Sequence, residues 1–183
     1  MWSFHLWQRF DLTSDFATFH QAWQQIATGN LNPRLTTFAY NYPRYGYPFW
    51  QSHLELAMWP LALLWWVSHS SFDLLVVQDL ALTGAGLVSL RWGLELVTQH
   101  WPERRRGSPI LGLALLIVLL INPWIYWTAT YDFHFQPIAC LFILLAARDL
   151  WNGRSRGWWW IAGVLLCGDV ASTYVVAVGL SFL

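Results

Sequence analysis

The sequence predicts an all-α, polytopic membrane protein with about four transmembrane helices. Charged residues make up 11% of the 183 residues and apolar residues 56%, whereas a soluble domain carries about 25% charged residues. Several long runs also lack charge, most clearly residues 107–131, and about 20 apolar residues suffice to cross a bilayer. This composition excludes an ordinary soluble enzyme and a disordered chain, and the formal net charge of zero argues against a nucleic-acid partner.

Each predicted span has its own signals. In the first, Ser71 or Asp73 is expected to cap the helix, and Gly84 and Gly86 allow close helix approach. Pro123 is expected to kink the end of the second span. Gly168 interrupts the last apolar run, which is therefore either one helix or a broken pair. The expected spans are 73–97, 108–128, 134–150 and 158–183.

Arginine placement predicts the orientation of these spans. Seven of the ten Arg residues are expected at one membrane face, and by the positive-inside rule that face is cytoplasmic. Residues 1–72 and 129–134 then lie on the extracytoplasmic side of the plasma membrane. The seven are Arg91, Arg104, Arg105, Arg106, Arg148, Arg154 and Arg156.

The outer region 1–72 is expected to carry two membrane-associated helices. Residues 14–28 place Phe16, Phe19, Trp23 and Ile26 on one face, between an N-cap at Thr13 or Ser14 and a stop at Gly29. This pattern is typical of an amphipathic helix lying on a membrane. Residues 54–69 are apolar but short and contain Pro60, which favours a juxtamembrane or re-entrant helix.

Polar and charged side chains gather on this outer side, and ionisable residues at a membrane protein's interface suggest a functional site. The first outer loop supplies Asp11, Asp15, His20, Arg34, Arg44, His53 and Glu55, and the second outer turn adds Asp132 and His134.

Four stretches carry a family resemblance: FDLTSDFATFHQAWQQIATGNLNP, HLELAMWPLALL, VVQDLALTGAG and YDFHFQPIA. Together, and in this order, they resemble the actinobacterial form of the DUF2079 family of bacterial membrane proteins. Its layout is similar to that of C-type glycosyltransferases, which use polyprenyl-phosphate sugars and carry an acidic residue in the first outer loop. The resemblance leads us to expect a further helix before FDLTSDF and further spans after GDVASTY, so that this chain corresponds to part of a larger layout.

The resemblance implies that Asp11 or Asp15 is the general base that deprotonates an acceptor hydroxyl. As a pair, these two carboxylates could instead hold a divalent cation. The structural alternative is that Asp15 favours the helix dipole and that Asp11 is a solvated loop residue. Asp132 and His134 either line the same cavity or act locally, with Asp132 capping the helix that starts near Gln136.

Five further residues complete the expected site. His53 and Glu55 could join the carboxylate cluster as substrate or metal ligands, or Glu55 could simply favour a helix N-terminus. Arg34 and Arg44 are candidates for holding a lipid phosphate, with general headgroup contact as the alternative. Trp50 is the tryptophan we consider for stacking on carbohydrate.

Two other functions remain open from the sequence. A noncatalytic scaffold would use the same helices without chemistry at the outer face. A small-solute transporter predicts repeated halves and polar residues near the bilayer centre, but the sequence has no internal repeat. Asp79 is expected to meet Gln78 or a neighbouring helix, and Asp169 has no assigned role.

Overall fold

The computed structural model describes residues 2–9, 12–36, 46–52, 54–100 and 108–181, and these residues form a mostly helical protein. The all-α prediction is confirmed. The described strands are two short antiparallel segments, β1 (Arg34–Leu35) and β2 (Tyr47–Pro48), in which Arg34 pairs with Pro48.

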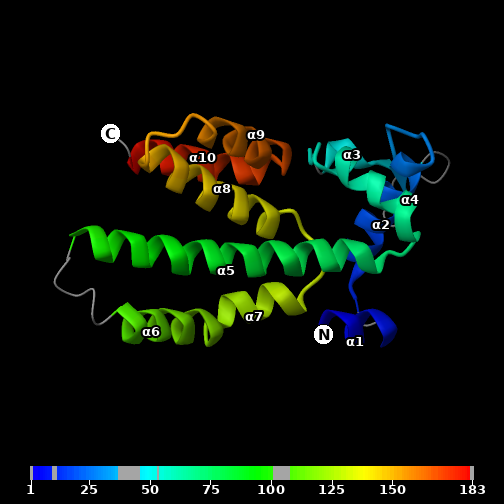
Figure 1. Cartoon of the computed structure of the whole chain (residues 1–183). Coiled ribbons are helices and arrows are strands. Elements are labelled where there is room, and N and C mark those ends of the chain that lie inside the picture. Colours follow the sequence, from blue (N-terminus) through cyan, green and yellow to red (C-terminus); the bar gives the residue numbers. More distant parts are fainter. Residues whose placement is uncertain (1, 10–11, 37–45, 53, 101–107, 182–183) are drawn as a thin grey trace.

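The longest helix, α5 (Phe72–His100), forms the axis of the structure (Figure 1). On one side it packs against α8 (Gln136–Trp151), and on the other against α6 (Ser108–Leu120) and α7 (Pro123–Thr130). At Gly84 an added Cβ would lie 3.2 Å from Leu141 of α8, so this glycine allows the predicted close approach. Gly86 has no atom within 4 Å of such a Cβ, so no helix approaches there.

Among the described residues, α5 is the one helix both long and apolar enough to cross a membrane. Its 29 residues extend about 43 Å at 1.5 Å per residue, against about 30 Å for the hydrocarbon core. The other three predicted spans correspond to shorter helices. The 16 residues of α8 extend only about 24 Å.

Backbone chemistry explains two of these interruptions. The predicted span 108–128 breaks at Asn122 because Pro123 has no N–H and cannot continue α6; it instead begins α7. The predicted span 158–183 is a broken pair, α9 (Gly157–Leu166) and α10 (Asp169–Ser181), folded back on one another. Gly168 makes the turn with φ of +123°, a conformation that favours glycine.

The N-terminal part forms a separate layer at the start of α5 (Figure 1). It contains α2 (Ser14–Ala27) and a helical run made of α3 (Met58–Leu61), the 3₁₀ turn η2 (Ala62–Leu64) and α4 (Trp65–Ser68). A further 3₁₀ turn, η1, spans Phe49–Gln51. An N-terminal helix that the sequence analysis did not predict, α1 (Trp2–Arg9), packs against α5 and α7.

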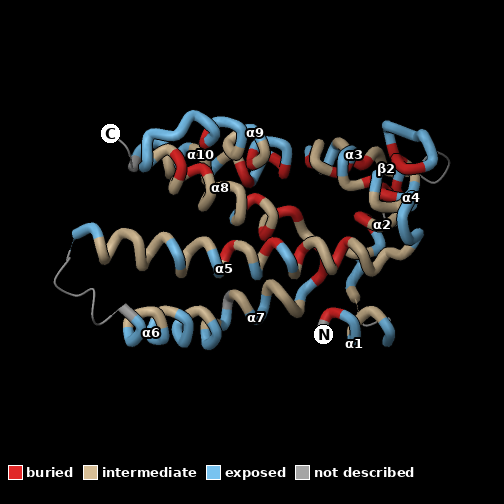
Figure 2. The backbone as a smooth tube through the Cα atoms, viewed as in Figure 1, coloured by how far each residue is buried: buried red, intermediate tan, exposed pale blue. Residues whose placement is uncertain are grey.

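The predicted amphipathic helix 14–28 is confirmed as α2, with Thr13 as its N-cap and Gly29 following its end with φ of +100°. Its apolar face packs against other parts of the protein, whereas the sequence analysis expected this face to lie on a membrane. Phe19 and Trp23 are fully buried in the main core, where the Trp23 indole donates a hydrogen bond to the Leu61 carbonyl at 2.9 Å. The buried residues in Figure 2 gather in this layer and along the start of α5 and α8.

The predicted helix 54–69 begins later, at Met58, and has two unlike faces. Met58 and Ala62 are buried against α2, whereas four large apolar side chains face outward. These are Trp59, Leu63, Trp66 and Val67, between 43% and 81% exposed.

Several arginine residues lie near the C-terminal end of α5, away from the N-terminal layer. Arg148 donates to Glu95 at 2.6 Å and joins α8 to α5. Asp149 accepts from Arg156 at 2.6 Å and from the Trp160 indole at 3.0 Å. The two ends of the structure therefore carry different chemistry.

Candidate functional site

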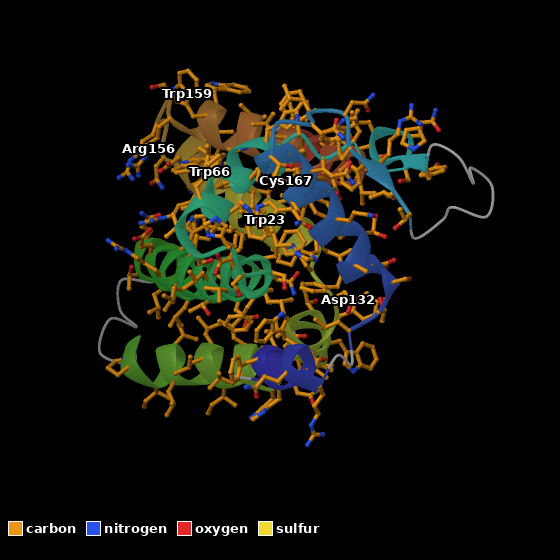
Figure 3. All side chains as sticks on the ribbon, turned by 90° about the vertical axis from the view of Figure 1, so that its right-hand side faces the viewer. Trp23, Trp66, Asp132, Arg156, Trp159 and Cys167 are labelled. Atoms are coloured by element: carbon orange, nitrogen blue, oxygen red, sulfur yellow. The ribbon has the colours of Figure 1, made fainter. Side chains whose placement is uncertain are left out.

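Asp132, in the turn between α7 and α8, fixes the beginning of α2 (Figure 3). Its side chain is buried and accepts hydrogen bonds from the backbone N–H groups of Thr13, at 2.9 Å, and Phe16, at 3.0 Å. The Thr13 hydroxyl also donates to it. The first N–H groups of a helix have no partner within the helix, and here a carboxylate 116 residues away along the chain satisfies one of them. Asp132 therefore caps α2. It does not cap the helix that starts near Gln136, which was one of the two roles predicted for it.

Gln78 of α5 holds the same turn from the other side. Its side chain is fully buried, accepts the His134 N–H at 2.7 Å and donates to the Thr128 carbonyl at 3.2 Å. Because both ends of the amide are used, Gln78 fixes the position of His134 relative to α5 and α7. The sequence analysis missed this role, although an amide within an apolar helix was an available signal.

The resulting arrangement brings Asp15 and His134 together. Asp15 lies in the first turn of α2, and its Oδ2 atom is 3.7 Å from His134 Nε2. The other ring nitrogen, Nδ1, lies 3.2 Å from the Asp132 carbonyl oxygen. Both ring nitrogens therefore have an oxygen atom nearby, and the 3.7 Å separation from Asp15 is longer than a hydrogen bond. The Asp15 side chain is 42% exposed and the His134 side chain 25%, so water reaches both groups. A carboxylate and an imidazole placed in this way can act as an acid–base pair.

A pocket of about 430 Å³ opens beside this pair. Its wall includes Trp127, Tyr131, His134 and Pro137, and the Tyr131 and His134 rings lie 5.4 Å apart. The Gln136 Oε1 atom is buried and accepts no hydrogen bond from the described part of the chain. Gln136 is also one of the residues that line the pocket.

Glu55 has different surroundings from the Asp15–His134 pair. It is 5% exposed and packs against the turn between α9 and α10, where a Cβ on Gly168 would lie 2.9 Å from its Cγ. Burial, with a smaller contribution from the negative charge of Asp169, raises the pKa of Glu55 from 4.5 to about 8. The backbone of Ala57 donates to the Leu166 carbonyl at 2.7 Å in the same region. Glu55 therefore connects the N-terminal layer to the α9–α10 hairpin.

Arg34 and Trp50 lie in the N-terminal layer and make local contacts. Arg34 donates through Nη1 to the Gly46 carbonyl at 3.4 Å, and the Trp50 indole donates to the Leu31 carbonyl at 3.0 Å. The Trp50 ring also packs edge-on against Trp59. Three further predicted site residues, Asp11, Arg44 and His53, lie outside the described residues.

Asp79 meets a neighbouring helix, α1, as the sequence predicted. The Ser3 hydroxyl of α1 lies 3.0 Å from its Oδ2 atom. Within the described ranges, no group of three or more His, Cys, Asp or Glu side chains is placed to hold a metal ion. The possible divalent cation therefore remains a prediction.

Comparison of the chain with protein-family models, with curated proteins and with solved structures gives no match. The resemblance to the DUF2079 family accordingly remains a prediction from the quoted motifs.

The Asp132 cap predicts a local effect of mutation. Replacing Asp132 with Ala leaves the N–H groups of Thr13 and Phe16 without their charged acceptor and should lower the free energy of unfolding by about 2–3 kcal/mol. Amide hydrogen exchange should accelerate at the first turn of α2. Asp15→Ala is the control because Asp15 accepts no hydrogen bond from these two groups. Equal exchange rates in Asp132→Ala and the parent protein would contradict the assignment.

The raised pKa of Glu55 predicts how stability depends on pH. The folded protein holds the proton up to pH of about 8, whereas the unfolded chain releases it near 4.5. The contribution of the neutral carboxyl to stability is therefore complete below pH 4.5 and is lost as pH rises toward 8. Thermal unfolding across this range should show a falling midpoint, and Glu55→Gln should remove most of that slope. Asp73→Asn, which removes a carboxylate at the start of α5, should keep it.

Proposed function

We propose that this chain is a multi-pass membrane protein that resembles C-type glycosyltransferases and transfers a sugar from a polyprenyl-phosphate donor. The observation that carries the proposal is the Asp15–His134 pair, with 3.7 Å between its nearest atoms, beside an aromatic pocket. The predicted likeness to the DUF2079 family adds the donor class.

The exposed surface of the helices supports the membrane part of the proposal. None of residues 109–120 in α6 is buried, although the helix is apolar all round. Figure 2 shows this helix and much of the α9–α10 hairpin as exposed or intermediate. An apolar surface of this extent is typical of contact with lipid or with another protein. Trp158 and Trp159 are 66% and 79% exposed beside Arg156, which is the usual arrangement at a membrane interface.

In the proposed layout the arginine-rich end of α5 is cytoplasmic and the N-terminal layer is extracytoplasmic. α5 crosses the bilayer, and α6 with α7 together form a second, interrupted crossing. α9 and α10 form a re-entrant hairpin, because helices of 10 and 13 residues extend only about 15 and 20 Å. The exposed face of α3–α4 rests at the outer interface.

The proposed reaction uses Asp15 as the base, with the His134 imidazole beside it. The Asp15 carboxylate removes the proton of an acceptor hydroxyl, and that oxygen forms a bond to the anomeric carbon of the sugar. The bond between this carbon and the phosphate oxygen breaks, and its electron pair leaves with the polyprenyl phosphate. In this proposal an N–H of the His134 imidazole donates a hydrogen bond to the leaving phosphate and stabilises the charge that develops there.

A noncatalytic scaffold is the second candidate, and a specific observation favours it. Asp132 is fully used in capping α2, and Glu55 is packed against the α9–α10 turn. Two of the predicted site carboxylates thus have structural roles that account for their positions.

Membrane insertion is testable on α6. Ile117 is 47% exposed, and Ile117→Arg should raise the cost of insertion by about 2.5–3.5 kcal/mol if this residue lies near the bilayer centre. The fraction of protein that remains with membranes after alkaline extraction should fall. Leu31→Arg is the matched control, since Leu31 is equally an exposed apolar residue but lies in the N-terminal layer. Release of the unmodified chain by alkaline extraction would rule out the membrane assignment.

The sugar-transfer step predicts a specific loss of activity. Membranes containing the protein should turn over one member of a panel of radiolabelled polyprenyl-phosphate sugars, and Asp15→Asn should lower the rate by about 100-fold or more. Asp73→Asn, another first-turn acid at the same end, should keep the parent rate. Protein abundance in the membrane is measured alongside. If no donor is turned over, or if Asp15→Asn keeps full activity, the sugar-transfer proposal is wrong and the scaffold function remains.

A further inference from the structure

A second cavity, of about 470 Å³, lies between α5, α6 and α7, on the opposite face of α7 from the His134 pocket. Ile125 and Ala129 of α7 line it, whereas Trp127 and Tyr131 line the pocket beside His134. Its volume lies within the range of small-molecule sites, about 300–1,000 Å³.

The polar groups of this cavity are all at one end. Asp79, Ser3 and Thr83 lie toward the start of α5, and the remaining wall is apolar, including Leu87, Leu90 and Leu116. From Asp79 to Leu90 the cavity follows α5 for about 16 Å at 1.5 Å per residue. A site with a polar end and a long apolar wall matches the form of a single lipid chain with its headgroup.

The polar groups at this end of the cavity determine which lipid headgroup can bind. The Ser3 hydroxyl has one hydrogen but two acceptors within reach, Asp79 Oδ2 at 3.0 Å and the Ala129 carbonyl at 2.9 Å. The Asp79 carboxylate therefore retains capacity to accept a hydrogen bond. None of the described side chains that line this cavity is basic, and the one acidic side chain among them, Asp79, would repel an anionic headgroup.

Gly86 keeps the cavity open. It lines the wall, and a Cβ built on it would have no atom within 4 Å. A larger side chain at this position would enter the cavity without first meeting another helix.

We propose that this cavity binds a lipid with an uncharged, hydroxyl-bearing headgroup, whose hydroxyl donates to Asp79 and whose chain lies along the leucines of α5 and α6. The site is separate from the Asp15–His134 pair. It requires that the bundle lies in lipid, but it does not require sugar transfer.

The test uses two photoreactive probes with the same 18-carbon chain, one a primary alcohol and the other the corresponding carboxylic acid at pH 8. The full chain is reconstituted in nanodiscs of phosphatidylcholine, and mass spectrometry maps the crosslinks. We expect crosslinks from the alcohol at α5 and α6 leucines of the cavity, and about tenfold weaker labelling there by the carboxylate, a difference of about 1.4 kcal/mol.

Variants separate the headgroup from the chain. Asp79→Asn should reduce the preference for the alcohol, because it removes the negative charge. Gly86→Phe should abolish labelling in the cavity by both probes. Gly179→Phe is the matched control, because Gly179 of α10 also has no atom within 4 Å of an added Cβ but lies outside the cavity.

Equal cavity labelling by the two probes in the parent protein, or unchanged labelling in Gly86→Phe, would overturn the proposal. Circular dichroism confirms that each variant is folded. The Asp15→Asn variant should label like the parent protein, so failure of the sugar-transfer proposal would leave this one standing. Failure here would equally leave sugar transfer untouched.

Discussion

Two buried polar side chains, Asp132 and Gln78, hold the turn at residues 132–135 between the N-terminal layer and the helical bundle. Asp132 caps α2 across the fold, and Gln78 binds the backbone of His134 from α5. Both side chains are buried and hydrogen-bonded, so losing one partner leaves a polar group unsatisfied at a cost of about 1–3 kcal/mol. These bonds determine where Asp15 lies relative to His134, and therefore whether the two can act together.

The same turn separates structural from chemical roles among residues close in sequence. Asp132 is buried and has three hydrogen-bond donors, whereas His134, two positions later, is partly exposed at the edge of a pocket. A capping carboxylate of this kind stabilises a helix, and an exposed imidazole beside a carboxylate can move protons. Asp15 has both roles. It lies in the first turn of α2, where a carboxylate stabilises the helix, and it also faces His134.

The bundle has two unlike sides. The side formed by α2, α8 and the start of α5 has a continuous buried core that includes Phe19, Phe133 and Leu74. On the side formed by α6 and α7, none of the residues whose burial is described, 109–123 and 125–130, is buried. An apolar helix with so little protein contact needs another apolar environment. The proposed lipid cavity lies on this second side, where α5 and α6 face one another across leucine side chains.

The sequence by itself determined the helical class, the apolar face of α2 with a cap at Thr13 or Ser14, a distortion of the helix at Pro123 and the gathering of Asp15, Asp132 and His134 at one end. These features follow from local periodicity, from proline and capping chemistry and from the order of apolar runs, which are readable in a single chain. Only the tertiary structure decided that Asp132 caps α2, that Gln78 holds His134, that Glu55 packs against Gly168, and that α9 and α10 fold back as a hairpin. The first three features depend on contacts between segments far apart in the chain, and the hairpin depends on the backbone conformation of Gly168. The hydropathy pattern specifies neither long-range contacts nor the conformation of a single residue.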